Sequence, residues 1–174
     1  NYCIVMGSEE LPKVELVALD ETLPSGTTLE VDGVHISMGS QRLTRELFKK
    51  IYSGILTEDR EHFFPPTSEE LEARQQMGHT HFAILDSDRK EIVGATRAAF
   101  RDIPKKGIMM RIFYPPYKGL IGRTFILPKF RRRHYGEASK AAIEEIAKER
   151  GVQTLRAVVY RRHKSSIAAL RKSG

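Results

Sequence analysis

The chain is poor in cysteine, lacks tryptophan and contains no long hydrophobic run. Because Cys3 is the only cysteine among 174 residues, the sequence can form neither an internal disulfide framework nor a cysteine-rich zinc site. A lone thiol is typical of a reducing compartment, and we expect a cytoplasmic protein. The apolar runs fall far short of the roughly 18 residues that a membrane-spanning helix needs. No secretory signal pattern is visible near Asn1.

The remaining composition is that of a globular protein. Hydrophobic residues make up 40% of the chain and charged residues 29%, which is enough apolar material for a core. The length suits one domain, and we find no internal repeat or low-complexity tract. We expect residues 28–174 to form this domain and residues 1–27 to form a strand pair and a linker.

Charge is distributed unevenly along the chain. Residues 1–100 contain 10 Lys+Arg and 17 Asp+Glu, whereas residues 101–174 contain 19 Lys+Arg and 5 Asp+Glu. The basic second part predicts an anionic partner. The phosphates of a cofactor, a nucleic acid, an acidic carrier protein and a membrane surface all meet this requirement, and composition does not choose among them.

Hydrophobic periodicity predicts helices and strands in a mixed order. The order of the elements indicates an α+β (mixed α/β) fold, with a crossover connection between two late strands. Asp32-Gly33 predicts a two-residue hairpin turn. We expect strands at residues 2–6, 14–19, 29–31, 34–36, 81–85, 92–100, 121–127 and 155–160, and helices at 40–55, 67–77, 136–150 and 165–172.

Two of these helix starts carry capping residues. Ser40 is placed to cap a helix whose apolar residues recur at helical spacing up to Ile55. Thr67 followed by Glu70 has the arrangement of a capping box, in which each side chain accepts from the other residue's amide.

The segment around Gly136 has the features of an anion site. The strand at 121–127 ends at Pro128, a basic loop follows, and Gly136 opens the next helix. The first turn of a helix presents unpaired N–H groups and the positive end of the helix dipole. A glycine there allows close approach of a ligand, and the loop residues Arg131, Arg132 and Arg133 add phosphate donors. An ordinary strand–helix connection with a solvated basic loop explains these residues equally well.

Residues 133–138, Arg-His-Tyr-Gly-Glu-Ala, resemble the R/Q-x-x-G-x-G/A signature of the GNAT superfamily of acyl-CoA N-acyltransferases. Residues 163–174 are similar to the family's N-x-x-A-x-x-x-Y-x-K-x-G helix, and the resemblance covers about residues 34–174. It implies a central mixed, mostly antiparallel sheet, flanked by helices and splayed between its fourth and fifth strands.

The resemblance also implies how acetyl-CoA or another acyl-CoA is held, without a metal. Arg131 and Arg132 would reach its phosphates, Ser166 would contact the cofactor, and the side chain of Tyr135 would form a lid over it. The pantetheine arm would pair, as an added strand, with main-chain groups of Phe125, Ile126 and Leu127. The pyrophosphate would be held by main-chain amides of Arg133, His134, Tyr135, Gly136, Glu137 and Ala138.

The chain departs from the family pattern at three places. The loop before the signature is longer, the usual Asn and Tyr positions are His163 and Leu170, and Gly174 stands where two more strands normally follow. The strand pair in residues 1–19 would complete the sheet by permutation, by exchange within a homodimer, or as the tail of a preceding domain. An unrelated N-terminal hairpin is the simpler alternative.

Leucine cannot donate the proton that a leaving thiolate needs, so another residue has to replace Leu170. Tyr160 and His163 are the candidate catalytic residues, with Ser165 and Ser166 close by in the sequence. A packing role for the tyrosine and a surface role for the histidine are the competing interpretations. His79 and His81 could form a metal pair, but no third ligand accompanies them, and we expect no metal site.

Two functions fit the sequence. The first is an N-acyltransferase in which a primary amine, on a small molecule or a peptide, attacks an acyl-CoA directly in a ternary complex. The cationic and aromatic loop at residues 101–119 would repel polyamines and would suit an anionic acceptor, a nucleotide-bearing amine, or an acyl-carrier protein as donor. A solvated insertion explains this loop equally well. The second is a catalytically degenerate basic module that binds nucleic acid or an acidic protein through residues 131–133, 161–164 and the same loop.

Overall fold

The computed structural model describes residues 10–54, 66–100, 119–152 and 154–157, together with Ile167, Ala168 and Arg171. No helix in this part of the chain is long and apolar enough to cross a membrane. The described elements are β1 (Val14–Ala18), β2 (Thr27–Val31), β3 (Val34–Gly39), α1 (Arg45–Ser53), α2 (Ser68–Gln76), β4 (His79–Asp86), β5 (Glu91–Phe100), β6 (Gly119–Ile126), the 3₁₀ turn η2 (Pro128–Phe130), α4 (Tyr135–Glu149) and β7 (Leu155–Ala157).

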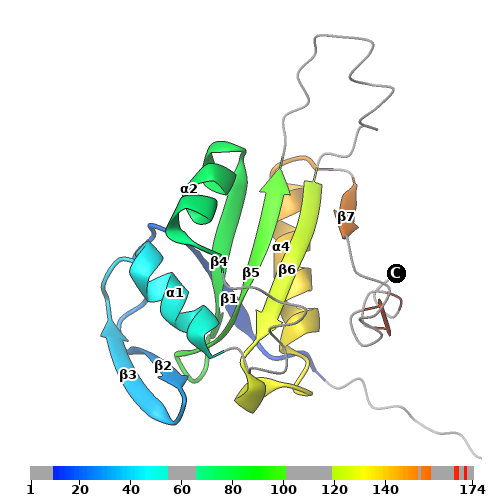
Figure 1. The fold of residues 1–174 in the computed structure, drawn as a ribbon. Helices are drawn as coiled ribbons and strands as arrows, with labels where there is room; N and C mark the ends of the chain where they lie inside the picture. Colours follow the sequence, from blue (N-terminus) through cyan, green and yellow to red (C-terminus); the bar gives the residue numbers. More distant parts are fainter. Residues whose placement is uncertain are drawn as a thin grey trace, which may run out of the picture.

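The strands form one mixed sheet of seven, drawn in Figure 1. Strands β1, β4, β5 and β6 are neighbours in that order and antiparallel, and β7 adds parallel to β6. The β2–β3 hairpin joins at the start of β5, where Thr28 pairs with Glu91. The predicted α+β fold with a mixed, mostly antiparallel sheet is confirmed.

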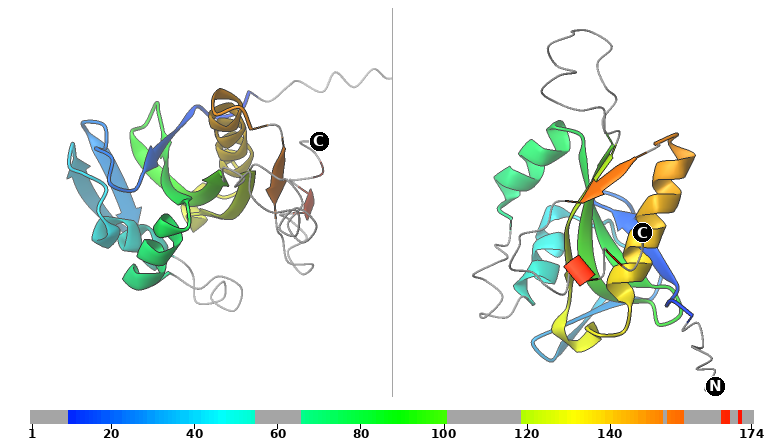
Figure 2. Two further views of the ribbon diagram at one scale, coloured as in Figure 1. Left: turned by 90° about the horizontal axis from the view of Figure 1, so that it is seen from above. Right: turned by 90° about the vertical axis from the view of Figure 1, so that its right-hand side faces the viewer.

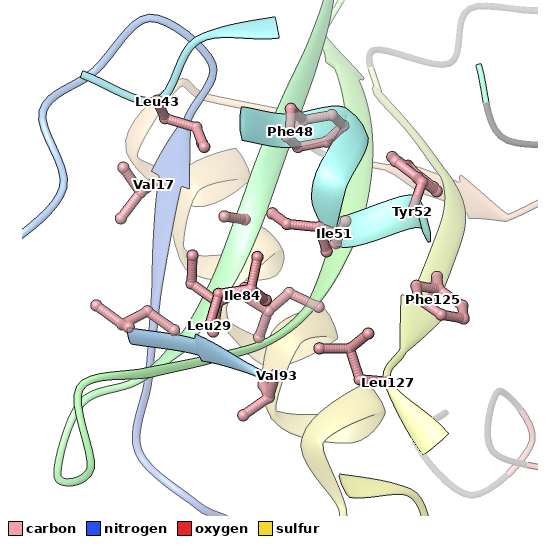
Figure 3. Packing of buried hydrophobic residues seen from close by; sticks show 14 of the residues in the cluster. Val17, Leu29, Leu43, Phe48, Ile51, Tyr52, Ile84, Val93, Phe125 and Leu127 are labelled. Atoms are coloured by element: carbon pink, nitrogen blue, oxygen red, sulfur yellow. The ribbon is translucent and has the colours of Figure 1, made fainter. Parts of the chain in front are cut away.

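Helices cover both faces of the sheet, as the two views of Figure 2 show. Helices α1 and α2 lie on one face and α4 lies on the other. The larger hydrophobic cluster includes Phe48, Ile51 and Phe125 and lies under α1 (Figure 3). A smaller cluster, which includes Ile121 and Ile143, packs α4 onto the opposite face. These two layers hold β6 and the start of α4 in place.

The local predictions around the turns and caps have mixed outcomes. Asp32 and Gly33 have φ angles of 52° and 76°, as the predicted two-residue hairpin requires. Thr67 forms the predicted capping box with Glu70. The prediction that Ser40 caps α1 is wrong, because Thr44 accepts from the amide of Leu47 at 3.2 Å and the helix starts only at Arg45.

The N-terminal segment contributes to the main sheet. Strand β1 pairs antiparallel with β4, on the side of β5 opposite to β6 and β7. Val17 and Leu19 lie in the same core cluster as Leu29, so these residues share a core across the expected boundary at 27/28. Residues 14–18 therefore do not extend the sheet beyond β7. Residues 2–6, the other half of the predicted strand pair, lie outside the described residues.

Candidate functional site

Strands β6 and β7 are paired over only a short length. The first three residues of β6, from Gly119 to Ile121, pair with β7, and none of the described strands pairs with that edge farther along. The register with β5 shifts between Ala95 and Arg97, which face Phe125 and Gly122, so β6 carries an extra residue there. A bulge of this kind bends a strand and increases its twist. In the second half of β6, the edge that faces away from β5 is therefore not paired with any described strand.

Main-chain groups near the end of β6 face in alternating directions. The amide of Leu127 donates to the carbonyl of Val93 at 2.9 Å, and its own carbonyl accepts from Phe130 at 2.9 Å. The carbonyl of Phe125 lies directly against Gly94 of β5, where a side chain would collide with it. Because successive residues of a strand alternate, Ile126 directs its main-chain groups to the outer edge. Of the three residues predicted to pair with pantetheine, Ile126 is the one so placed.

Helix α4 starts without a side-chain cap. The residue before it, His134, has a left-handed conformation with φ of 61° and no side-chain cap hydrogen bond. The amide of Ala138 donates to the carbonyl of His134 at 2.9 Å. Within the described part of the chain, no acceptor bonds the preceding three amides, those of Tyr135, Gly136 and Glu137. A Cβ atom added at Gly136 would meet nothing within 4 Å. The helix start is therefore accessible to an anion through its main chain.

The side chain of Tyr135 points into the protein. It is 4% exposed, and its ring meets the ring of Phe130 edge-on. Its hydroxyl donates to Oδ2 of Asp86 at 2.5 Å, while Oδ1 of Asp86 accepts from the amides of Asp88 and Arg89. Burial and this hydrogen bond raise the pKa of Tyr135 to about 12. The prediction that Tyr135 forms a lid is wrong, because its side chain anchors the helix to the β4–β5 turn.

The basic residues before α4 are exposed. Arg131, Arg132 and Arg133 all lie at the surface, and the left-handed φ of Arg132, 62°, turns the loop sharply before the helix. The Nε atom of Arg131 donates to the carbonyl of Ile126 at 3.3 Å. The Nδ1 atom of His134 lies 3.3 Å from a carboxylate oxygen of Glu137. The predicted cluster of three arginines thus adjoins both the helix start and the outer edge of β6.

Lys129 connects the turn after β6 to two other strands. Its ammonium group contacts Glu30 of β2 at 2.7 Å and Glu91 of β5 at 3.2 Å. These contacts lower the pKa of Glu30 and raise the pKa of Lys129. The arrangement holds η2, and with it the loop that leads into α4, against the sheet.

The predicted catalytic residues cannot be placed. Tyr160, His163 and Ser166 lie outside the described residues, as do Leu170 and the loop at 101–118. Their roles remain predictions. His81 is buried and its ring meets Phe48 edge-on at 5.7 Å, and no group of three metal-ligating side chains occurs among the described residues.

Sequence reasoning missed Asp86 as part of this site. It lies 49 residues before Tyr135 in the chain, at the end of β4. The one available signal is its place before a polar turn, which is also the ordinary place of an aspartate that accepts turn amides. That pattern does not indicate a tyrosine partner.

Solved structures resemble this fold. An acetyltransferase from Thermus thermophilus has 20% identity and a TM-score of 0.51, over 74% of this chain and 78% of that one. A transcriptional regulator from Bacillus halodurans C-125 has 14% identity and a TM-score of 0.53, over 74% and 84%. An acetyltransferase from Trypanosoma brucei has 15% identity and a TM-score of 0.50, over 91% of each chain. At identities this low, the structural similarity shows a shared fold and nothing more about this chain.

Comparison with curated proteins yields no significant match. The model of the acetyltransferase (GNAT) family matches residues 45–174 of this chain. This span contains α1, α2, β4 to β7, the three arginines and the uncapped start of α4. Since it covers well over half of the sequence, the chain belongs to the acetyltransferase (GNAT) family.

Proposed function

We propose that the protein transfers an acetyl or other acyl group from acyl-CoA to a primary amine. The observation that carries the proposal is the start of α4, where three main-chain amides lack an acceptor within the described residues. Such amides at the positive end of a helix dipole bind phosphate groups. The family of the chain supports the choice of coenzyme A as the source of those phosphates.

The residues present fit a diphosphate. The space in front of Gly136 admits a ligand atom close to the main chain, because an added Cβ would meet nothing there. Arg131, Arg132 and Arg133 supply positive charge beside it, and their guanidinium groups can bind phosphate oxygens in pairs. Tyr135 keeps the helix start in position through Asp86. These groups would hold the phosphates before any reaction takes place.

The outer edge of β6 would hold the rest of the cofactor. Ile126 directs its main-chain groups to the edge that no described strand pairs with, and its carbonyl already accepts from Arg131. An amide of the pantetheine arm could bond there as one more strand. We propose that Ile126, rather than Phe125 or Leu127, makes this contact, since the main-chain groups of those two face β5 and η2.

When bound, the cofactor supplies a thioester carbonyl that an amine can attack. The chain has to accept a proton from the amine and deliver one to the thiolate. We propose Tyr160 and His163 for these steps, since Leu170, at the family's tyrosine position, has no proton to give. No observation among the described residues favours the nucleic-acid-binding alternative.

Thermal unfolding with and without acetyl-CoA tests the proposal. A ligand that binds only the folded state raises the melting temperature, so we expect a shift of several degrees at millimolar acetyl-CoA. Release of free thiol from acetyl-CoA in the presence of amines then measures transfer. We expect Tyr160→Phe or His163→Ala to lower kcat without removing the thermal shift. A melting temperature that acetyl-CoA does not change would refute the proposed function.

A further inference from the structure

Arg97 is a cation on the face of the sheet that α1 and α2 cover. Ala95, two residues earlier on β5, belongs to the core cluster under α1, and residues two apart on a strand share a face. The residue opposite Arg97 on β4 is His81, whose ring contacts Phe48 of α1. The residue opposite it on β6 is Gly122. Arg97 therefore lies in the middle of the sheet, on the face away from α4.

The guanidinium group of Arg97 lies next to Gly122, in space that a side chain at that position would occupy. A Cβ added at Gly122 would lie 3.1 Å from the Nη2 atom of Arg97 and 3.9 Å from its Cζ atom. Gly122 directly follows the three residues of β6 that pair with β7. The positive charge thus lies at the point where the paired part of β6 and β7 ends.

No carboxylate among the described residues forms an ion pair with Arg97. Its neighbours along and across the sheet are Ala95, Ala99, His81 and Gly122, none of which is acidic. Arg97 is half-buried, and a cation withdrawn from water is unfavourable unless an anion accompanies it. A guanidinium group binds a carboxylate through two parallel hydrogen bonds.

The phosphates of coenzyme A have a separate site. We assign them to the start of α4, which follows the far end of β6, whereas Arg97 lies beside its first half. The family resemblance implies that the reacting carbon lies near Phe125, and from Gly122 to Phe125 is three residues of strand, or roughly 10 Å. This is about the distance between the amine and the carboxylate of a short peptide. An anion at Arg97 would thus belong to the acceptor.

We propose that Arg97 binds a carboxylate of the acceptor, so that the preferred acceptors are amines that also carry a carboxylate at about this distance, such as short peptides. This inference rests on the proposed acyltransferase function. It assigns to Arg97 a role in selecting the acceptor and none in binding the acyl donor.

Matched pairs of amines test the inference. Dipeptides and tripeptides are compared with their C-terminal amides and with polycationic amines, and thiol release from acetyl-CoA gives kcat/KM for each. We expect the carboxylates to react at least about 30-fold faster than their amides, as loss of one partner of a desolvated charge pair implies. Arg97→Gln should abolish this preference, and Arg97→Lys should keep part of it.

Two controls separate this inference from the proposed function. Arg45→Gln removes another half-buried arginine, whose partner is Glu72, and it should leave the preference unchanged. The thermal shift with acetyl-CoA should be the same in wild type, Arg97→Gln and Arg97→Lys. Equal rates for acids and amides, turnover of polycationic amines only, or no turnover of either member of any pair would overturn the inference. Loss of the thermal shift in wild type would instead overturn the proposed function.

Discussion

Helices α2 and α4 start in opposite ways. At α2 the hydroxyl of Thr67 accepts from the amide of Glu70, and the carboxylate of Glu70 accepts from the amide of Thr67. At α4 the preceding residue, His134, provides no such bond, and three amides lack an acceptor in the described part of the chain. The chain thus bonds the third amide of α2 through its own capping residue, whereas the three amides at the start of α4 have no acceptor among the described residues.

The start of α4 is nevertheless held firmly. Where α2 is fixed through its main-chain amides, α4 is fixed through the side chain of its first residue, Tyr135, which bonds Asp86 and packs on Phe130. This difference shows how a helix end can be rigid and accessible at once. Fixed amides bind an anion more tightly than mobile ones, because less motion is lost on binding.

The largest effect is expected from a charge placed in the α4 start. In Gly136→Asp the new side chain has room and its charge suits a helix N-terminus, so the melting temperature of the free protein should not fall. Affinity for acetyl-CoA should fall at least about 100-fold, because juxtaposed like charges cost several kcal/mol. Calorimetric titration measures this change.

Ser68→Asp is the matched control for that variant. It adds the same charge to the first turn of α2, where the amide of Glu70 is already bonded to Thr67. Affinity for acetyl-CoA should stay at the wild-type value. If Gly136→Asp binds as tightly as Ser68→Asp, the assignment of the α4 start as a phosphate site is wrong.

A smaller effect is expected from Tyr135→Phe. Removing the hydroxyl deprives Oδ2 of Asp86 of its donor, and stability should fall by about 1–3 kcal/mol. Affinity for acetyl-CoA should fall by up to about tenfold, since the amides of the helix start become less fixed. Chemical denaturation and titration measure the two effects. In the double variant Tyr135→Phe with Asp86→Asn, the loss of stability should be smaller than the sum of the losses in the two single variants. Additive losses would count against an interaction between Tyr135 and Asp86.

The same pair predicts a dependence on alkaline pH. The pKa of Tyr135 is raised from 10.0 to about 12 in the folded protein, so the folded state holds its proton more tightly than the unfolded state does. The stabilisation is therefore complete below pH 10 and is lost as the pH rises toward 12. The stability difference between wild type and Tyr135→Phe should shrink over this interval. A difference that does not change with pH would exclude this coupling.

The smallest effects concern the caps themselves. Thr67→Ala should lower stability by about 1 kcal/mol, because the amide of Glu70 loses its acceptor. His134→Gly should cause a smaller loss, since it removes only a surface contact with Glu137 and no side-chain cap, and the left-handed φ of 61° suits glycine. Denaturant unfolding of both variants measures the difference. Equal losses would mean that the two helix starts are stabilised in the same way.

Local patterns predicted several elements of this fold correctly. Two turn and cap predictions are confirmed, the capping box at Thr67 and the hairpin at Asp32-Gly33. The predicted succession of a strand, a basic loop and a helix is also confirmed, as β6, the loop before α4, and α4. The cap of α1 was assigned to the wrong residue, although both Ser40 and Thr44 are good capping types. The carbonyl of Gln41 accepts from the amide of Leu23, and Leu43 exchanges main-chain bonds with Asp20 and Glu21. These bonds keep this stretch out of the helix, which starts only after them.

The candidate site was predictable only in part. Gly136 and the arginines were recognisable because their chemistry is contained in one short segment. The inward orientation of Tyr135 and the location of Arg97 depend on Asp86, His81 and Gly122, which come from other strands. No local pattern carries that information. The proton-transfer roles of Tyr160 and His163 remain predictions.

By itself, the sequence determined that a helix with a glycine and an alanine in its first turn follows a loop of several arginines. It thereby determined where an anion can approach main-chain amides. Dihedral preferences and helix periodicity act over a few residues, which is why such features can be read directly. The tertiary structure alone decided that Asp86 reaches Tyr135 and that Arg97 lies over Gly122. Those contacts depend on strand register, which is set by the packing of two cores from residues distant in the chain.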